Sequence, residues 1–206
     1  ELAPGDAKAL RSAASLARIL GDVDRALDLV TRAAAVDPLS AATHRQAAMI
    51  HLMGGHFDAA EASFQLALDI SPSSGLNHAF LAFARLLQGR TDEALAIAGQ
   101  ESHAVFRNLA LSLVHHKLGN AAASDAALQA LTAEFAWTAA YQIAEAHAFR
   151  GEVDTAFEWL ETAYVQRDPG VVYTAWSPAL KSLHGDPRWL PFLTRLGLAD
   201  HAKLSP

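Results

Sequence analysis

The stretch Gly55-His56-Phe57-Asp58-Ala59-Ala60 ends one helix and begins the next, and the chain repeats it several times. Glycine at a helix C-terminus adopts the left-handed conformation at little cost. The Asp three residues later is suited to cap the following helix or to stabilise its start by charge. The Ala two residues further on is small enough for that helix to lie close against its predecessor. The stretch therefore predicts a tight helical hairpin.

Related stretches begin at Gly21, Gly89, Gly119 and Gly151. An interval of 34 residues separates the first three glycines of the series, and the prolines Pro4, Pro38 and Pro72 keep the same interval. The next two intervals are 30 and 32 residues, so the third repeat is shortened. A fixed period of this length predicts a helical solenoid.

Five helical pairs follow from this register, with a break at residues 99–102. The predicted helices are 7–20 with 23–36, 40–53 with 57–70, 75–88 with 91–99, 104–118 with 121–134, and 137–150 with 153–166.

Small residues recur where the two helices of a pair would cross. Seven residues before each glycine stand Ala14, Ala48, Ala82, Ser112 and Ala144, and five after it stand Ala26, Ala60, Ala94, Ser124 and Ala156. Such columns bury a continuous core only when neighbouring pairs stack.

The period, the small columns, the glycine turn and the closing proline resemble the tetratricopeptide repeat family over residues 7–167. His44 and His78 depart from it, because they stand where the family has an early aromatic residue. The resemblance implies an all-α fold, a right-handed α-solenoid of helix-turn-helix repeats with a helical C-terminal cap. It also implies a protein-interaction module.

Composition limits the function classes. The 206 residues are half apolar, carry a net charge of −6 and include no cysteine. This composition excludes disulfides and cysteine zinc sites, and it argues against nucleic acid as the main partner. No stretch is long enough to span a membrane, so no membrane insertion is expected. Cytosol is favoured over periplasm, and residues 1–6 are interpreted as the remnant of a preceding repeat in a longer protein.

Residues 168–206 are predicted to form the cap. Trp176, Leu180, Leu183, Trp189, Phe192 and Leu196 would cover the fifth repeat, and Asp186 with Pro187 would begin the last helix. This tail is similar to the end of repeat arrays in bacterial multidomain signalling proteins, such as nucleotide cyclases and winged-helix regulators. The similarity implies a module of a larger bacterial signalling or regulatory protein.

Catalysis, metal binding and cofactor binding are not expected. Among ten histidines, His51, His115 and His147 share one column of the repeat, which favours a packing role over metal binding. No phosphate-binding loop, nucleophile elbow or zinc-protease motif is present. An enzyme is therefore the least favoured interpretation.

The resemblance implies that the first helix of each pair lines a concave groove, which is the expected binding surface. Residues 13, 10, 6 and 3 before each glycine lie on one face, here named the first-helix stripe. Its candidate partner-binding residues are Lys8, Arg11, Arg18, Arg45, Met49, Leu76, Phe83, Phe106, Leu113, Tyr141 and Glu145. The stripe runs from basic to apolar, which predicts a protein or peptide partner with acidic and apolar side chains. Two alternatives stay open, since the apolar residues could be core or could mediate a homodimer.

Overall fold

The computed structural model describes residues 6–200, and every regular element in that range is helical. The α-helices are α1 (Ala7–Ile19), α2 (Val23–Val36), α3 (Ala41–Met53), α4 (Phe57–Ile70), α5 (Asn77–Leu87), α6 (Thr91–Ala98), α7 (Ala104–Lys117), α8 (Ala121–Phe135), α9 (Ala140–Phe149), α10 (Val153–Gln166) and α11 (Trp189–Leu196). Two 3₁₀ helices, η1 (Pro169–Trp176) and η2 (Pro178–Leu183), precede α11. The fold is an α-solenoid of helical hairpins. Within residues 6–200, no helix is both long and apolar enough to cross a membrane.

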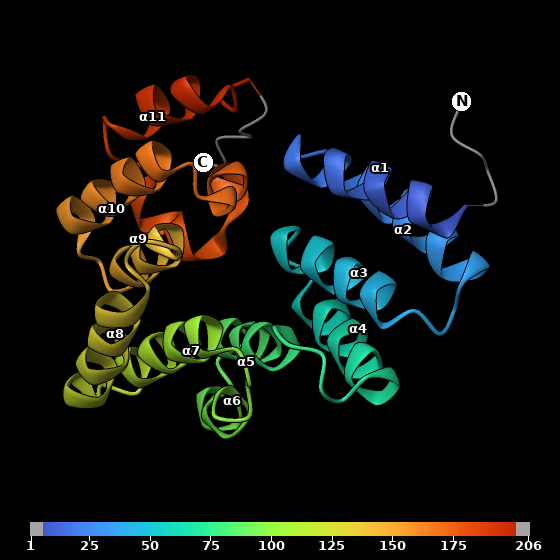
Figure 1. Cartoon of the computed structure of the whole chain (residues 1–206), viewed down its shortest axis with the longest axis horizontal. Helices are drawn as coiled ribbons and strands as arrows, with labels where there is room; N and C mark the ends of the chain where they lie inside the picture. The colour runs from blue at the N-terminus through green and yellow to red at the C-terminus, as the bar shows by residue number, and fades with distance from the viewer. Residues whose placement is uncertain (1–5, 201–206) are drawn as a thin grey trace. The chain divides into compact units, whose positions relative to one another are not determined.

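The chain divides into two compact units after Ser102. The first unit contains the hairpins α1–α2, α3–α4 and α5–α6, and the second contains α7–α8, α9–α10 and the tail. Figure 1 shows α1 beside α2 and α3 beside α4. The helix α6 has only eight residues, and no helix lies between Ala98 and Ala104.

The glycine turns form as predicted. Gly21, Gly55, Gly89, Gly119 and Gly151 all have φ between 73° and 80°, in the left-handed region. The capping prediction is partly wrong, because the N-cap is the residue directly after each glycine. Asp22, for example, accepts a hydrogen bond from the Arg25 amide at 3.1 Å. The aspartates two residues further along lie in the first helical turn, where their charge favours the helix dipole.

The small columns are buried as predicted. Ala14, Ala48, Ala82 and Ala144 are fully buried, as are Ala26, Ala60, Ala94 and Ala156. In the fourth repeat both columns hold serine, and the Ser124 hydroxyl donates to the Ser112 carbonyl oxygen at 2.8 Å. A hydrogen bond between the helices thus accompanies the close packing there.

Several predicted boundaries are wrong. Helix α5 begins at Asn77 instead of Gly75, and Leu76 precedes it with φ 78°. Helix α9 begins at Ala140 instead of Trp137. The last helix begins at Trp189, because Asp186 and Pro187 form a turn in which the Asp186 carboxylate accepts from the Arg188 amide at 2.9 Å.

The tail packs on the fifth repeat. Leu180, Leu183, Trp189 and Phe192 are at most 2% exposed, and they share one core with residues of α9 and α10. Trp176 and Leu196 are partly buried against the same core. Of the predicted remnant at residues 1–6, only Asp6 lies within the described part of the chain, and its side chain caps α1. Residues 201–206 of the predicted cap lie outside it.

Candidate functional site

The basic residues of the first-helix stripe lie on α1 and α3 in the first unit. Lys8 is exposed, Arg11 and Arg45 are half-buried, and Arg18 is buried. Arg18 Nη1 lies 3.7 Å from Met53 Sδ, and Arg45 Nη1 donates to Ser74 Oγ at 3.1 Å. The two helices are joined where Gln46 Nε2 donates to the Arg11 carbonyl oxygen at 2.7 Å. The structure thus brings Arg11 and Arg45 onto adjacent helices.

The helices that carry these cations contain no carboxylate residues. Helices α1, α3 and α5 contain no Asp or Glu, whereas α2, α4 and α6 each contain at least two. Helix α3 packs against both α1 and α5, so the three acid-free helices are neighbours. Within residues 6–200, Lys8, Arg11 and Arg45 form no ion pair with a carboxylate. The Arg11 Nε atom is buried without a hydrogen-bond acceptor in the same range.

The apolar residues of the stripe differ in exposure. Met49 and Leu76 are half-buried and Phe83 is 8% exposed in the first unit. In the second unit Phe106 is half-buried and Leu113 is 2% exposed. A partner could reach Met49, Leu76 and Phe106 without rearrangement of the fold. Phe83 and Leu113 contribute mainly to the core in the unbound protein.

Tyr141 and Glu145 on α9 contact the tail. Ser177 Oγ donates to Glu145 Oε1 at 2.6 Å, and Ser182 Oγ donates to the Ala148 carbonyl oxygen at 2.6 Å. Gly170 packs so closely on the Tyr141 ring that a Cβ atom at position 170 would collide with it. The Tyr141 hydroxyl is buried beside Glu145 and Ser177 without a well-formed hydrogen bond. The fifth-repeat part of the stripe therefore faces residues 170–182 of the same chain.

The same contacts change two acid–base equilibria. Burial, together with the nearby Asp168 charge, raises the pKa of Glu145 to about 7, while the hydrogen bond from Ser177 opposes the rise. Burial, followed by the charge of Glu145, raises the pKa of the Tyr141 hydroxyl. The Glu145 carboxyl group therefore keeps its proton to a higher pH than an exposed carboxyl group does.

Two buried carboxylates were missed by the sequence analysis. Glu101 Oε2 accepts from the Ala79 amide at 3.2 Å, at the start of α5. Asp168 accepts from the Tyr141 amide at 3.1 Å and from the Gly170 amide at 2.8 Å, at the start of α9. Each acid lies after the second helix of its repeat and caps the first helix. The available signal was the absence of a capping side chain at Leu76 and Ala139.

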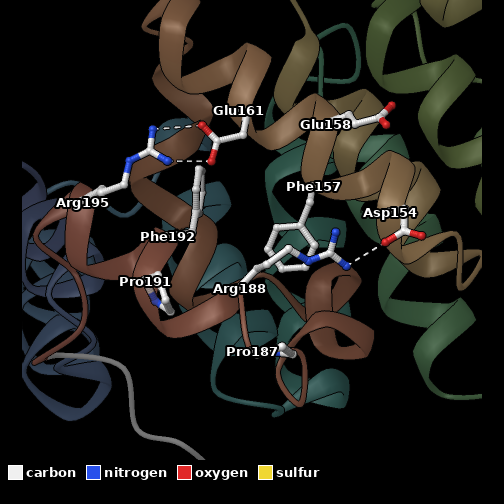
Figure 2. A pocket seen from close by; sticks show the side chains of 9 residues that line it. All are labelled: Asp154, Phe157, Glu158, Glu161, Pro187, Arg188, Pro191, Phe192 and Arg195. Atoms are coloured by element: carbon white, nitrogen blue, oxygen red, sulfur yellow. Dashed lines mark hydrogen bonds and ion pairs between the residues drawn. The ribbon is translucent and has the colours of Figure 1, made fainter.

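A pocket of about 680 Å³ opens between α10 and α11. Figure 2 shows Phe157 and Phe192, which line the pocket, together with the side chains of Arg188 and Arg195. Arg195 binds Glu161 through two nitrogens at 2.6 and 2.9 Å. Arg188 lies 4.3 Å from the centre of the Phe157 ring. It pairs with Asp154 and with Asp186, each at 2.8 Å, and its hydrogen bonds lower the pKa of Asp186 to about 2. Since both arginines are neutralised, we interpret these contacts as fastening α11 to α10.

The histidine column has the surroundings of packed side chains. Burial, followed by the charge of His56, lowers the pKa of His51. His147 Nδ1 hydrogen-bonds to the Glu152 carboxylate. Over residues 6–200, no three metal-ligating side chains gather in a group that could hold a metal ion.

Comparisons with known proteins agree with this architecture. The sequence profile described as "Tetratricopeptide repeat" matches residues 4–75 and 109–171. No curated protein gives a match to the sequence. Similar solved structures include TTC0263, a thermophilic TPR protein from Thermus thermophilus, which is 19% identical with a TM-score of 0.64 over 94% of this chain and 98% of that one.

Two further solved structures are similar. PilF of Pseudomonas aeruginosa is 16% identical, with a TM-score of 0.58 over 95% of this chain and 86% of that one. YrrB, described as a TPR protein with an unusual peptide-binding site, is 17% identical, with a TM-score of 0.52 over 83% of this chain and 92% of that one. At these identities the likeness concerns the fold alone.

Proposed function

Because the chain belongs to the tetratricopeptide repeat family, we propose that it is a scaffolding module that binds a peptide or a partner domain along its first-helix stripe. Proteins of this family generally mediate protein–protein interactions, and the fold is typically non-enzymatic. The proposal therefore assigns a binding role and no reaction.

The observation that carries the proposal is the separation of charge in the first unit. Lys8, Arg11 and Arg45, which form no ion pair with a carboxylate among the described residues, lie on neighbouring helices that contain no carboxylate. Half-buried Met49 and Leu76 belong to the same stripe. A segment with Asp or Glu beside aliphatic or aromatic residues complements both properties, because opposite charge speeds encounter and apolar contact slows dissociation.

The wider setting is part of the proposal. The resemblance of the tail to repeat arrays of bacterial signalling proteins supports a module of a larger regulatory protein, and we propose the cytosol as its compartment. YrrB, which has a peptide-binding site, supports a peptide as the class of ligand. In the second unit, Phe106 offers the accessible apolar contact of the stripe.

Fluorescence anisotropy with a labelled peptide library tests the proposal. One arm contains peptides of Asp, Glu, Leu and Phe, and the matched arm replaces the acids by Lys. We expect binding of the acidic arm only, with an affinity that falls as salt is raised. Equal binding of both arms by the native chain would contradict the proposed ligand class.

A charge-reversal variant gives the residue-level control. Arg11→Glu combined with Arg45→Glu should slow association of the acidic peptides about tenfold or more. Arg25→Glu combined with Arg32→Glu is the matched control, because it changes the net charge by the same amount and both arginines are exposed on the second helix α2. An equal loss in both variants would show that overall charge, and not the stripe, drives binding.

A further inference from the structure

An edge of the second unit exposes large apolar side chains that the proposed function does not use. Trp137, in the turn between α8 and α9, is 85% exposed, and Val165, near the end of α10, is 77% exposed. Gln166 Nε2 donates to the Ala136 carbonyl oxygen at 3.3 Å, which joins the two segments. We name Glu134, Trp137, Val165 and Arg167 the α8–α10 edge.

Hydrogen bonds order the backbone of both segments. The Thr138 and Ala139 amides donate to the Phe135 carbonyl oxygen at 3.0 and 2.8 Å. At the end of α10, the Asp168 amide donates to the Ala163 carbonyl oxygen at 2.9 Å, and the buried Asp168 side chain anchors the chain that follows. The exposed side chains therefore start from fixed backbone, which reduces the entropy lost when they are covered.

The two charged residues of the edge occupy locally unfavourable positions. Arg167 has φ 57° and ψ 39°, a left-handed conformation that costs a non-glycine residue free energy. Glu134 lies in the last turn of α8, where a negative charge opposes the helix dipole. Within residues 6–200, neither side chain has an ion-pair or hydrogen-bond partner. The hydrogen bonds that end α10, from the Arg167 amide to the Tyr164 carbonyl oxygen and from the Asp168 amide to the Ala163 carbonyl oxygen, offset the cost at Arg167. What a partner can still satisfy are the two charges, which have no ion-pair partner within the described residues.

We propose that the α8–α10 edge is an interface for a second copy of this chain. The edge is self-complementary. The segment around the end of α8 contains the acid Glu134 and the apolar Trp137, and the segment around the end of α10 contains the base Arg167 and the apolar Val165. A two-fold axis near the Gln166–Ala136 hydrogen bond exchanges the segments. Glu134 then faces Arg167 of the second copy, and Trp137 covers Val165 of the second copy. The symmetry repeats both contacts, so each occurs twice in the dimer. A symmetric dimer gives all four residues of each copy a partner within a single interface.

The expected dimer is weak and reversible. Two large apolar side chains per copy form a small contact, well below the area of obligate dimers. Sedimentation velocity of the native chain from about 10 μM to about 1 mM should show a monomer–dimer equilibrium within that range. Trp137→Ala should raise the dissociation constant at least about tenfold, because tryptophan contributes strongly at interface centres.

The charges provide the decisive experiment. In a dimer of the Glu134→Arg variant, each of the two symmetric contacts would place two positive side chains against each other. In a dimer of the Arg167→Glu variant, each contact would place two negative side chains against each other. Each variant alone should be monomeric up to about 1 mM, whereas an equimolar mixture should form a heterodimer with both contacts attractive. Leu39→Ala is the control, because Leu39 is 78% exposed in the first unit and should leave the native equilibrium unchanged.

Circular dichroism of each variant establishes that it is folded. A native chain that is monomeric at every concentration overturns the proposal. The proposal is also overturned if the Trp137→Ala variant dimerises with the same dissociation constant as the native chain. A mixture of the two charge variants that stays monomeric overturns it as well. Recovery of the dimer on mixing supports the proposed pairing. The readout needs no peptide ligand, so its outcome is independent of the proposed function.

Discussion

At the scale of single residues, Glu145 couples the stability of the fold to pH near neutrality. The pKa of its carboxyl is raised from 4.5 to about 7, first by burial. The folded protein therefore binds this proton more tightly than the unfolded chain does. The resulting stability is fully present below pH 4.5 and is lost as pH rises through about 7.

The variant Glu145→Gln tests this coupling. The amide oxygen of glutamine still accepts from Ser177 Oγ but carries no charge, so the desolvation cost above pH 7 disappears. We expect the variant to be more stable than the native chain at pH 8 by on the order of 2 kcal/mol, and about equal at pH 4.5. Urea unfolding at both pH values measures the difference. Glu158→Gln, an exposed carboxylate on α10, should change neither value. A native stability that does not fall between pH 5 and pH 8 contradicts the coupling.

At the scale of elements, the first helices of the third and fifth repeats are capped from a distance. Helices α1 and α3 take caps from their own Asp6 and Ser40. Helices α5 and α9 have no such side chain and receive the carboxylates of Glu101 and Asp168 instead. Glu101 thus connects the start of α5 to the segment after α6, and Asp168 connects the start of α9 to the segment after α10.

Removal of the Asp168 carboxylate should destabilise the second unit. Asp168→Ala leaves the amides of Tyr141 and Gly170 without their acceptor, which should cost about 2–4 kcal/mol. Asp168→Asn keeps one oxygen acceptor and should cost about half as much. Hydrogen exchange should locate the loss, with faster exchange of the Tyr141 amide and unchanged protection in α1–α4. Equal stability of the alanine variant and the native chain would mean that water replaces the cap at no cost.

At the scale of the whole molecule, the chain consists of two units, and each unit contains a buried apolar cluster. One cluster lies in the first two repeats, and another combines α9, α10, η1, η2 and α11. The tail belongs to the second cluster through Leu180, Leu183 and Leu193, all of which are fully buried. The tail is therefore part of the core of the second unit and not an appendage to it.

A single truncation in the tail tests this assignment. Leu183→Ala removes a fully buried side chain and should cost about 2–5 kcal/mol. Leu190→Ala is the matched control, because Leu190 is 48% exposed on α11 and should cost little. Calorimetry measures both changes. We expect faster hydrogen exchange in α9 and α10 and no change in α1–α4, because the affected core contains residues of the second unit only. Equal melting of the two variants would contradict a core role for the tail.

The sequence by itself determined the helical pairs and their packing columns. The glycine turns, the alanine columns and the short third repeat depend on residues within one repeat, and a periodic sequence displays such local information directly. Trp189, Phe192, Leu180 and Leu183 could likewise be assigned to the cap, because an array must cover its last apolar face.

Only the tertiary structure decided how segments distant in sequence meet. The capping roles of Glu101 and Asp168, the contact of Tyr141 and Glu145 with residues 170–182, and the exposure of Trp137 all depend on such contacts. The 3₁₀ geometry of the tail and the burial of Phe83 likewise depend on contacts between segments distant in sequence. Helical periodicity gives the face on which a residue lies, whereas the segment that covers this face is selected by the packing of the folded chain.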